Sequence, residues 1–249
     1  MLLQACLNGD RERGVPKTPA ELAAAAAACV AAGARSIHCH PRGADGAETL
    51  APEPIAAAVH ALREAVPRVE LSLSTGLWIT AGDVDARTRA IAGWTERPDL
   101  VSVNVSEEGW TEVVGLLSER NIGIEAGVWT VADVEALAES GLVARWGHGR
   151  RGSGRRHAPV TRILVEPPSE SAPDAIALAA DIDAALDAAA IPTPRLHHGV
   201  GPATWAVMAA AVAKGRDIRV GLEDVQTLPD GRPAPDNAAL VTEAALLYS

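Results

Sequence analysis

The sequence predicts a (β/α)8 barrel, and three observations lead to this fold class. Eight short apolar segments alternate with eight helix-like segments along the chain. The apolar segments lack a clean alternation of polar and apolar residues, which is typical of parallel strands buried on both faces. The chain has 249 residues, a length at which α/β barrels often form one domain. Eight units fit a closed barrel better than an open doubly wound sheet, so we expect one catalytic barrel domain over residues 1–249.

Apolar runs and turn residues place the strands. Asn8-Gly9 stops the first apolar run, and Thr75-Gly76 breaks the third. We expect strands at residues 2–7, 34–40, 69–74, 100–105, 123–129, 162–166, 195–198 and 218–222.

Capping signals place the helices. Thr18 is suited to an N-cap, Pro19 to the first helical position, and Glu21 to the third residue after the cap. Gly33 ends this alanine-rich helix, and Thr130 caps a later one. We expect helices at residues 19–32, 52–65, 83–93, 110–119, 131–140, 172–190, 202–213 and 237–247.

The composition narrows the class of protein. Hydrophobic residues make up 48% of the chain, with no Phe and one Tyr, so the core must be built from small and branched side chains. A net charge of −10 argues against nucleic acid as a partner. The three cysteines, Cys6, Cys29 and Cys39, form no spaced framework and indicate reduced, buried thiols. No signal peptide or membrane-spanning run is recognisable, so we expect a cytoplasmic protein without a membrane partner.

Two histidines end the second expected strand. His38 and His40 lie two residues apart, so in a strand both imidazoles point to the same face. Such a pair suits a borderline cation such as zinc, although both could instead be hydrogen-bonded core histidines. Glu223 directly follows the last expected strand, and two histidines with one carboxylate leave a position open, as in catalytic zinc sites. Glu223 and Asp224 could also form an exposed turn with a helix cap.

Active sites of such barrels lie at the carboxyl ends of the strands. The candidate substrate contacts at those ends are Ser74, Thr75, Asn104 and Glu125. The first two fit a turn equally well. His197 and His198 also end a strand, and because neighbouring side chains alternate, at most one of them faces the site.

A basic segment at residues 149–157 follows the fifth expected strand. Its glycines alternate with the arginines Arg150, Arg151, Arg155 and Arg156. The backbone N–H groups of glycines, which no side chain shields, and the guanidinium groups of arginines both suit phosphate binding. A solvated loop is an equally good interpretation.

Two motifs give the chain a family resemblance. The stretch from His38 to Arg42 with Asp45-Gly46 resembles the His-x-His-x-Arg…Asp-Gly stretch of the β-keto acid cleavage enzymes, typified by 3-keto-5-aminohexanoate cleavage enzyme. The stretch from Arg219 to Asp224, with the sequence RVGLED, is similar to the C-terminal signature of that family. Asn8-Gly9, residues 18–21 and residues 73–76 also stand where the family has equivalents, so the resemblance spans most of the barrel.

The resemblance implies specific roles. His38, His40 and Glu223 would hold Zn²⁺ or another divalent metal, which binds the β-keto acid through its ketone and carboxylate. Asp224 and Arg219 would generate the carbon nucleophile, and Ser74 would lie near the substrate carboxylate. The implied reaction condenses the β-keto acid with acetyl-CoA and then cleaves the product to acetoacetate and a new acyl-CoA.

The resemblance also implies partners. We expect β-keto acid and acetyl-CoA as small-molecule partners and a homo-oligomer, either tetramer or dimer. The arginines of residues 149–157 are candidates for the CoA diphosphate.

Two other functions remain open. An amidohydrolase-type metal hydrolase also uses His-x-His in a barrel, but there the pair belongs on the first strand, with further histidines on the fifth and sixth. The second alternative is a non-catalytic barrel that binds a keto acid. Such a protein would need no acid–base pair, so the presence of Arg219 and Asp224 argues against it. The substituent of the keto acid cannot be read from the sequence.

Overall fold

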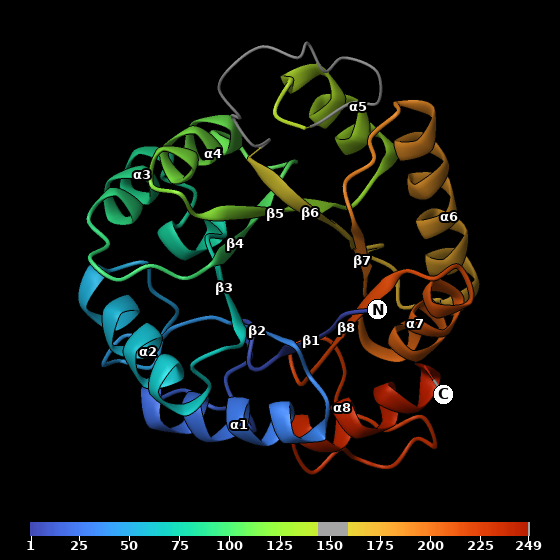
Figure 1. Ribbon diagram of the computed structural model, residues 1–249, viewed down its shortest axis with the longest axis horizontal. Coiled ribbons are helices and arrows are strands. Elements are labelled where there is room, and N and C mark those ends of the chain that lie inside the picture. Colours follow the sequence, from blue (N-terminus) through green and yellow to red (C-terminus); the bar gives the residue numbers. More distant parts are fainter. Residues whose placement is uncertain (144–158, 249) are drawn as a thin grey trace.

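The computed structural model describes residues 1–143 and 159–248 and shows a closed barrel of eight parallel strands in chain order. Helices surround the barrel, and the fold class is the expected (β/α)8 barrel (Figure 1). The strands are β1 (Leu3–Cys6), β2 (Ser36–Cys39), β3 (Glu70–Ser74), β4 (Leu100–Asn104), β5 (Gly123–Val128), β6 (Val160–Val165), β7 (Arg195–His197) and β8 (Asp217–Val220).

The outer layer follows the predicted order. Its helices are α1 (Pro19–Ala32), α2 (Pro52–Ala65), α3 (Val84–Ala92), α4 (Trp110–Glu119), α5 (Val131–Ser140), α6 (Ala172–Ala188), α7 (Thr204–Ala213) and α8 (Asn237–Ala245). Three 3-10 turns, at Leu77–Thr80, Gly201–Ala203 and Leu246–Tyr248, join or extend them. The last two replace the expected ends of the helices at 202–213 and 237–247.

The sequence signals act as expected at the helix starts. The Thr18 side chain accepts from the Glu21 backbone N–H, and the Glu21 carboxylate accepts from the Thr18 N–H, which forms a capping box. Thr130 and Asp133 form a second box at α5. Residues Leu22, Ala26 and Cys29 of α1 are buried against the barrel, and α1 lies between α2 and α8 (Figure 1).

Closure of the barrel joins the first strand to the last. β8 pairs with β1 in the register Gln4↔Arg219. Gly221 follows β8 in close contact with β1, since a Cβ there would lie 1.8 Å from the Cys6 carbonyl oxygen. Because of this close contact, the residues that follow Gly221, which include Glu223 and Asp224, lie directly above the end of β1.

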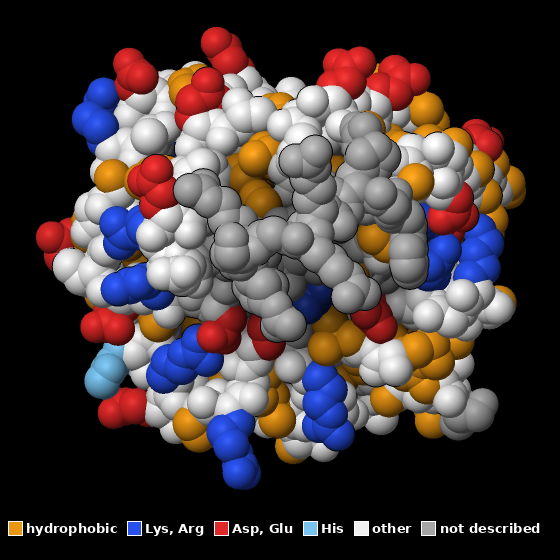
Figure 2. All heavy atoms as spheres, turned by 45° about the horizontal axis from the view of Figure 1, so that its top comes forward, with side chains coloured by type: hydrophobic (Ala, Val, Ile, Leu, Met, Phe, Trp, Pro, Cys, Tyr) orange, Lys and Arg blue, Asp and Glu red, His pale blue; other side chains and the backbone are white. Residues whose placement is uncertain are grey.

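The three cysteines are free and buried. Within the described ranges, each helix is too short or too polar to span a bilayer. On the face in Figure 2, acidic side chains are most numerous along the upper edge, and basic ones are scattered over the left, right and lower parts. Among the described residues visible there, no extended basic surface appears, in line with the net charge of −10.

Candidate metal centre and active site

The carboxyl end of β2 brings the two histidines together. His38 lies in β2, and His40 follows its last residue, with ring centroids 5.1 Å apart in an edge-to-face arrangement. Both are buried. Asn8, just after β1, fixes the backbone of His40: its Oδ1 accepts from the His40 N–H, and its Nδ2 donates to the His40 carbonyl, each at 2.8 Å.

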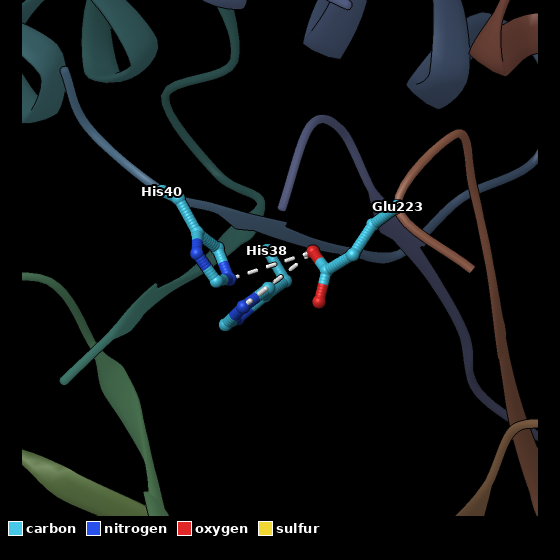
Figure 3. A group of neighbouring side chains, drawn as sticks. All are labelled: His38, His40 and Glu223. Carbon is cyan, nitrogen blue, oxygen red and sulfur yellow. Dashed lines mark ion pairs between the residues drawn. The ribbon is translucent and has the colours of Figure 1, made fainter. Parts of the chain in front are cut away.

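Glu223 completes the group from the other end of the chain. Its Oε2 lies 4.0 Å from His38 Nε2 and 3.6 Å from His40 Nε2, and the three side chains point toward one another (Figure 3). Gly9 makes room for it, because a Cβ there would lie 2.4 Å from Glu223 Cγ. The Asn8-Gly9 turn therefore positions His40 through Asn8 and leaves space for Glu223 at Gly9.

These three side chains fit a divalent metal. One atom from each lies within 4.8 Å of the other two. Glu223 Oε2 is buried and has no hydrogen-bond partner among the described residues. Burying a carboxylate oxygen in this way costs free energy unless a cation binds to it. Two imidazoles and one carboxylate are a donor set that zinc accepts, with a fourth position left open.

Two of the three donors, His38 and Glu223, are in the protonation state that a metal ion requires, while His40 would have to release a proton. Burial lowers the pKa of His38 well below its ordinary value, which keeps this imidazole neutral. Burial also lowers the pKa of His40, but Glu223 and Glu48 outweigh it and raise that pKa to about 9 in the metal-free protein. Burial raises the pKa of Glu223, yet Arg219 and the histidines hold it well below its ordinary value, so Glu223 is ionised.

Arg219 and Asp224 form a buried ion pair beside the candidate metal ligands. Arg219 Nη2 lies 3.0 Å from Asp224 Oδ1 and also contacts Glu223. The thiol of Cys6 donates to Asp224 Oδ2 at 2.7 Å. Burial raises the pKa of Asp224, but Arg219 and His198 outweigh it and lower the pKa. Asp224 is thus a carboxylate held in place from several directions.

Of the two neighbouring histidines, His198 faces the site. Its Nδ1 lies 3.3 Å from Asp224 Oδ1, and its Nε2 lies 3.5 Å from Glu166 Oε2. Burial and Arg219 lower the pKa of His198, but Asp224 and Glu166 raise it to about 9. His197 points outward instead, with Nε2 3.4 Å from Asp183 Oδ1 of α6. The alternation expected for strand neighbours is confirmed here.

A cavity of about 480 Å³ opens above the candidate metal ligands. Its lining includes both candidate acid–base residues and two of the four candidate substrate contacts. The lining residues are Asp10, His38, His40, Ser74, Trp78, Ser102, Asn104, Trp129, Glu166, Pro167, Pro168, Glu170, His198, Gly199, Val200, Arg219, Glu223 and Asp224.

Two candidate substrate contacts do not line this cavity. Thr75 is fully buried and donates to the Ser102 carbonyl at 2.6 Å. Glu125 is the third residue of β5, not its last, and is also fully buried. Its side chain lies inside the barrel below the cavity, in an ion pair with Arg162. The expected contact between Glu125 and substrate therefore has no support in this geometry.

The family assignment follows from comparison with known proteins. The family model described as beta-keto acid cleavage enzyme matches residues 2–145 and 171–249. The chain belongs to the beta-keto acid cleavage enzyme family. The resemblance predicted from the two outer motifs is confirmed, and the stretches that carry these motifs lie within the matched residues.

Three solved structures of ObcA share the fold. They are the apo structure (TM-score 0.69, 17% identity), the binary complex with oxaloacetate (0.67, 17%) and the ternary complex with a C4-CoA adduct and oxalate (0.66, 18%). Each match covers 93% of this chain but only 61–63% of the ObcA chain. This member of the beta-keto acid cleavage enzyme family therefore spans about three-fifths of the length of ObcA.

Several residues of the site were not predicted. Glu48 contacts His40 Nδ1, and Trp78 stacks on the His40 ring at 6.2 Å while donating to Glu48 Oε2 at 3.0 Å. Trp129 donates to Glu166 Oε2 at 3.1 Å on the cavity wall. Glu48 comes from a loop and Trp78 from the 3-10 turn at Leu77–Thr80, neither of which has a periodic signal, and only the family motif around His40 directs attention to that region. The predicted phosphate contacts Arg150, Arg151, Arg155 and Arg156 lie outside the described residues.

Proposed function

We propose that this chain is a divalent-metal-dependent enzyme that condenses a β-keto acid with acetyl-CoA and cleaves the product to acetoacetate and a new acyl-CoA. Membership of the beta-keto acid cleavage enzyme family supports the reaction class. The single observation that carries the proposal is the convergence of His38, His40 and Glu223 with the Arg219–Asp224 pair in one cavity.

The metal ligands in this proposal are His38, His40 and Glu223, with zinc as the first candidate. When bound, the metal would act as a Lewis acid on the ketone and carboxylate of the substrate and make its α-proton more acidic. The glutamate–imidazole contact between Glu48 and His40 Nδ1 orients that ring, as carboxylates commonly do for metal-bound histidines.

Asp224 is the proposed base for the α-proton. Its carboxylate lines the cavity and is kept ionised by Arg219, so it can accept a proton from a bound substrate. Arg219 balances the charge of Asp224 and Glu223 and fixes the direction of both carboxylates. Ser74 and Asn104, which line the same cavity, are the proposed contacts of the substrate carboxylate and substituent.

The structure disfavours the amidohydrolase alternative. The His-x-His pair stands at the end of β2, not β1, and neither β5 nor β6 contains a histidine; Glu125 lies within β5, and Glu166 follows β6. A keto-acid-binding protein without turnover remains the second candidate, and an activity assay separates the two.

Metal analysis is the first test. Purified wild-type protein should contain about one metal ion per chain, and the His38→Ala/His40→Ala variant should lose it. Glu223→Ala should lower metal content as well, and full occupancy in that variant would contradict the ligand assignment.

Turnover is the second test. The metal-loaded protein should convert β-keto acids and acetyl-CoA to acetoacetate, measured by coupled assay over a panel of keto acids. Oxaloacetate belongs in the panel, since it is bound in one ObcA structure. Substrate binding without acetoacetate formation across the panel would favour the binding-protein alternative.

Use of CoA and the oligomeric state are part of the same proposal. Replacing Arg150 and Arg151 with Ala should raise the KM for acetyl-CoA more than the KM for the keto acid, if these cations contact the CoA diphosphate. Equal effects on both KM values would point to a general role of these arginines instead.

We also propose that the protein is a homo-oligomer, which light scattering tests directly.

A further inference from the structure

Glu125 accepts hydrogen bonds from three side chains inside the barrel. Its Oε1 accepts from Arg162 Nη1 at 2.7 Å and from Gln4 Nε2 at 2.9 Å. Its Oε2 accepts from the hydroxyl of Ser72. These partners come from β6, β1 and β3, and all of them are buried. The carboxylate does not line the substrate cavity, so its interior position needs another explanation.

Ser72 connects this carboxylate to a metal ligand. Its Oγ lies 3.1 Å from His38 Nδ1. A serine hydroxyl has one proton, and here that proton is donated to Glu125, which is ion-paired with Arg162 and acts only as an acceptor. Ser72 can then only accept from His38, so Nδ1 carries the imidazole proton.

The consequence falls on the other nitrogen of the ring. In the neutral imidazole one nitrogen is a donor and the other an acceptor. With the proton on Nδ1, the lone pair of His38 is on Nε2, the atom that faces Glu223 Oε2. A metal ion needs this lone pair, and hydrogen bonds to the remote nitrogen are the usual means of providing it.

We propose that Glu125 is a positioning residue, which acts through Ser72 to fix the tautomer and ring orientation of His38 for metal binding. This inference rests on the metal site of the proposed function and deepens it. It gives the buried carboxylate a role different from the substrate contact expected from the sequence.

Replacement of Glu125 by Gln is the decisive variant because it keeps the shape and reverses one hydrogen bond. Arg162 and Gln4 both donate at the position of Oε1, so the new amide oxygen must face them. The amide nitrogen then faces Ser72 and donates to its Oγ. The Ser72 proton becomes free to donate to His38 Nδ1, which selects the tautomer with the proton on Nε2 and blocks the metal.

Nitrogen NMR of the metal-free protein tests the tautomer directly. The chain has seven histidines, so the His38 signals are identified by their loss in His38→Asn. We expect a protonated Nδ1 and an unprotonated Nε2 in the wild type and the reverse in Glu125→Gln. A proton on Nε2 of the wild-type ring, or an unchanged tautomer in Glu125→Gln, would overturn the inference.

Zinc affinity, measured by competition with a fluorescent chelator, is the second readout. Glu125→Gln and Ser72→Ala should each weaken zinc binding by about 10–100-fold, the usual effect of losing an outer-shell partner. The matched control is Ser36→Ala, which removes another fully buried hydroxyl that contacts Gln4 but not His38. The control should bind zinc within about threefold of the wild type, a change well below that effect. Equal loss in all three variants would mean a general packing effect and would overturn the inference.

Two further measurements keep the outcomes distinguishable. Circular dichroism checks that each variant is folded, and Ser72→Thr, which retains a hydroxyl, should restore most of the affinity lost in Ser72→Ala. A wild-type protein that binds no zinc would contradict the proposed function, while the tautomer in the metal-free protein would still decide the role of Glu125. Zinc binding unaffected by Glu125→Gln would contradict only the inference.

Discussion

At the scale of single residues, the contacts of Asp224 show how the site holds the proposed base in place. Cys6, Arg219 and His198 surround its carboxylate from three strand ends, at 2.7, 3.0 and 3.3 Å. Burial and Asp224 raise the pKa of the Cys6 thiol well above its ordinary value, so Cys6 remains a neutral donor. The carboxylate therefore has little freedom to turn away from a bound substrate.

Replacing Asp224 with Asn should separate chemistry from metal binding. The amide keeps the shape but cannot accept a proton, so we expect the turnover rate to fall by at least about 100-fold, the lower range for loss of a general base. Metal content, measured by elemental analysis, should stay near that of the wild type because Asp224 is not a proposed ligand. Loss of metal together with activity would show that the two carboxylates act as one structural unit.

At the scale of elements, the helix starts follow local rules that the sequence reveals. Thr18→Ala removes the hydroxyl half of the capping box at α1 and should lower the free energy of unfolding by about 1 kcal/mol, measured by urea denaturation. The control is Thr242→Ala, whose hydroxyl bonds to the Ala238 carbonyl within α8. That change should stay within about 0.5 kcal/mol. A larger loss in the control would contradict the capping explanation.

The contact between α6 and β7 depends on a buried charge cluster. Asp183 Oδ1 lies 2.8 Å from Arg195 Nη1 and 3.4 Å from His197 Nε2, and Lys214 Nζ lies 3.5 Å from Oδ2. Burial raises the pKa of Asp183, but His197 and Arg195 outweigh it and hold that pKa well below its ordinary value. The outward-facing histidine thus has a structural role.

This cluster predicts a pH dependence of stability. The pKa of Asp183 is lower in the folded chain, so its contribution is complete above the unfolded-state pKa of about 3.9 and is lost as the pH falls below it. Asp183→Asn should lose about 3 kcal/mol at pH 7, as for a broken buried pair, and the difference from wild type should shrink near pH 3. Urea denaturation at both pH values measures it, with exposed Asp181→Asn on α6 as control. A constant difference at both pH values would contradict the assignment.

At the scale of the whole molecule, metal binding should stabilise the barrel. At a metal concentration about 1,000 times the Kd, binding to the folded chain alone adds about 4 kcal/mol. In a chain of this size that raises Tm by about 8–16 °C, which thermal unfolding with and without a chelator measures. The His38→Ala variant should show no such difference. An equal Tm for the loaded and chelated wild type would contradict a metal site that joins the ends of the barrel.

The fold could be predicted because its signals are local. The expected bounds of α2, α4 and α5 agree with the structure, and Thr130 caps α5 as expected. Strand ends were less exact, because pairing with neighbours decides where a strand stops. The prediction extended the strand of His40 to that residue, whereas β2 ends at Cys39.

The candidate site was predictable only in part. His38, His40 and Glu223 stand in motifs, and the barrel brings them together. Glu125 was placed at the rim because the depth of a residue along a strand depends on how the barrel is sheared, not on its own neighbours in sequence. Ser72 contacts His38 across neighbouring strands, and Glu48 contacts His40 from a loop. Such contacts cannot be predicted from a spacing pattern in the sequence.

The pairing of β1 with β8 sets the order in which the site can come into being during protein synthesis. The ribosome completes the two histidines early, while Glu223 and Asp224 are among the last residues of the barrel to emerge. Until then the nascent chain offers a metal ion two imidazoles without the carboxylate. The proposed metal centre is therefore complete only when the barrel closes, and a chain stalled before its last strand would contain neither all three candidate ligands nor the proposed base.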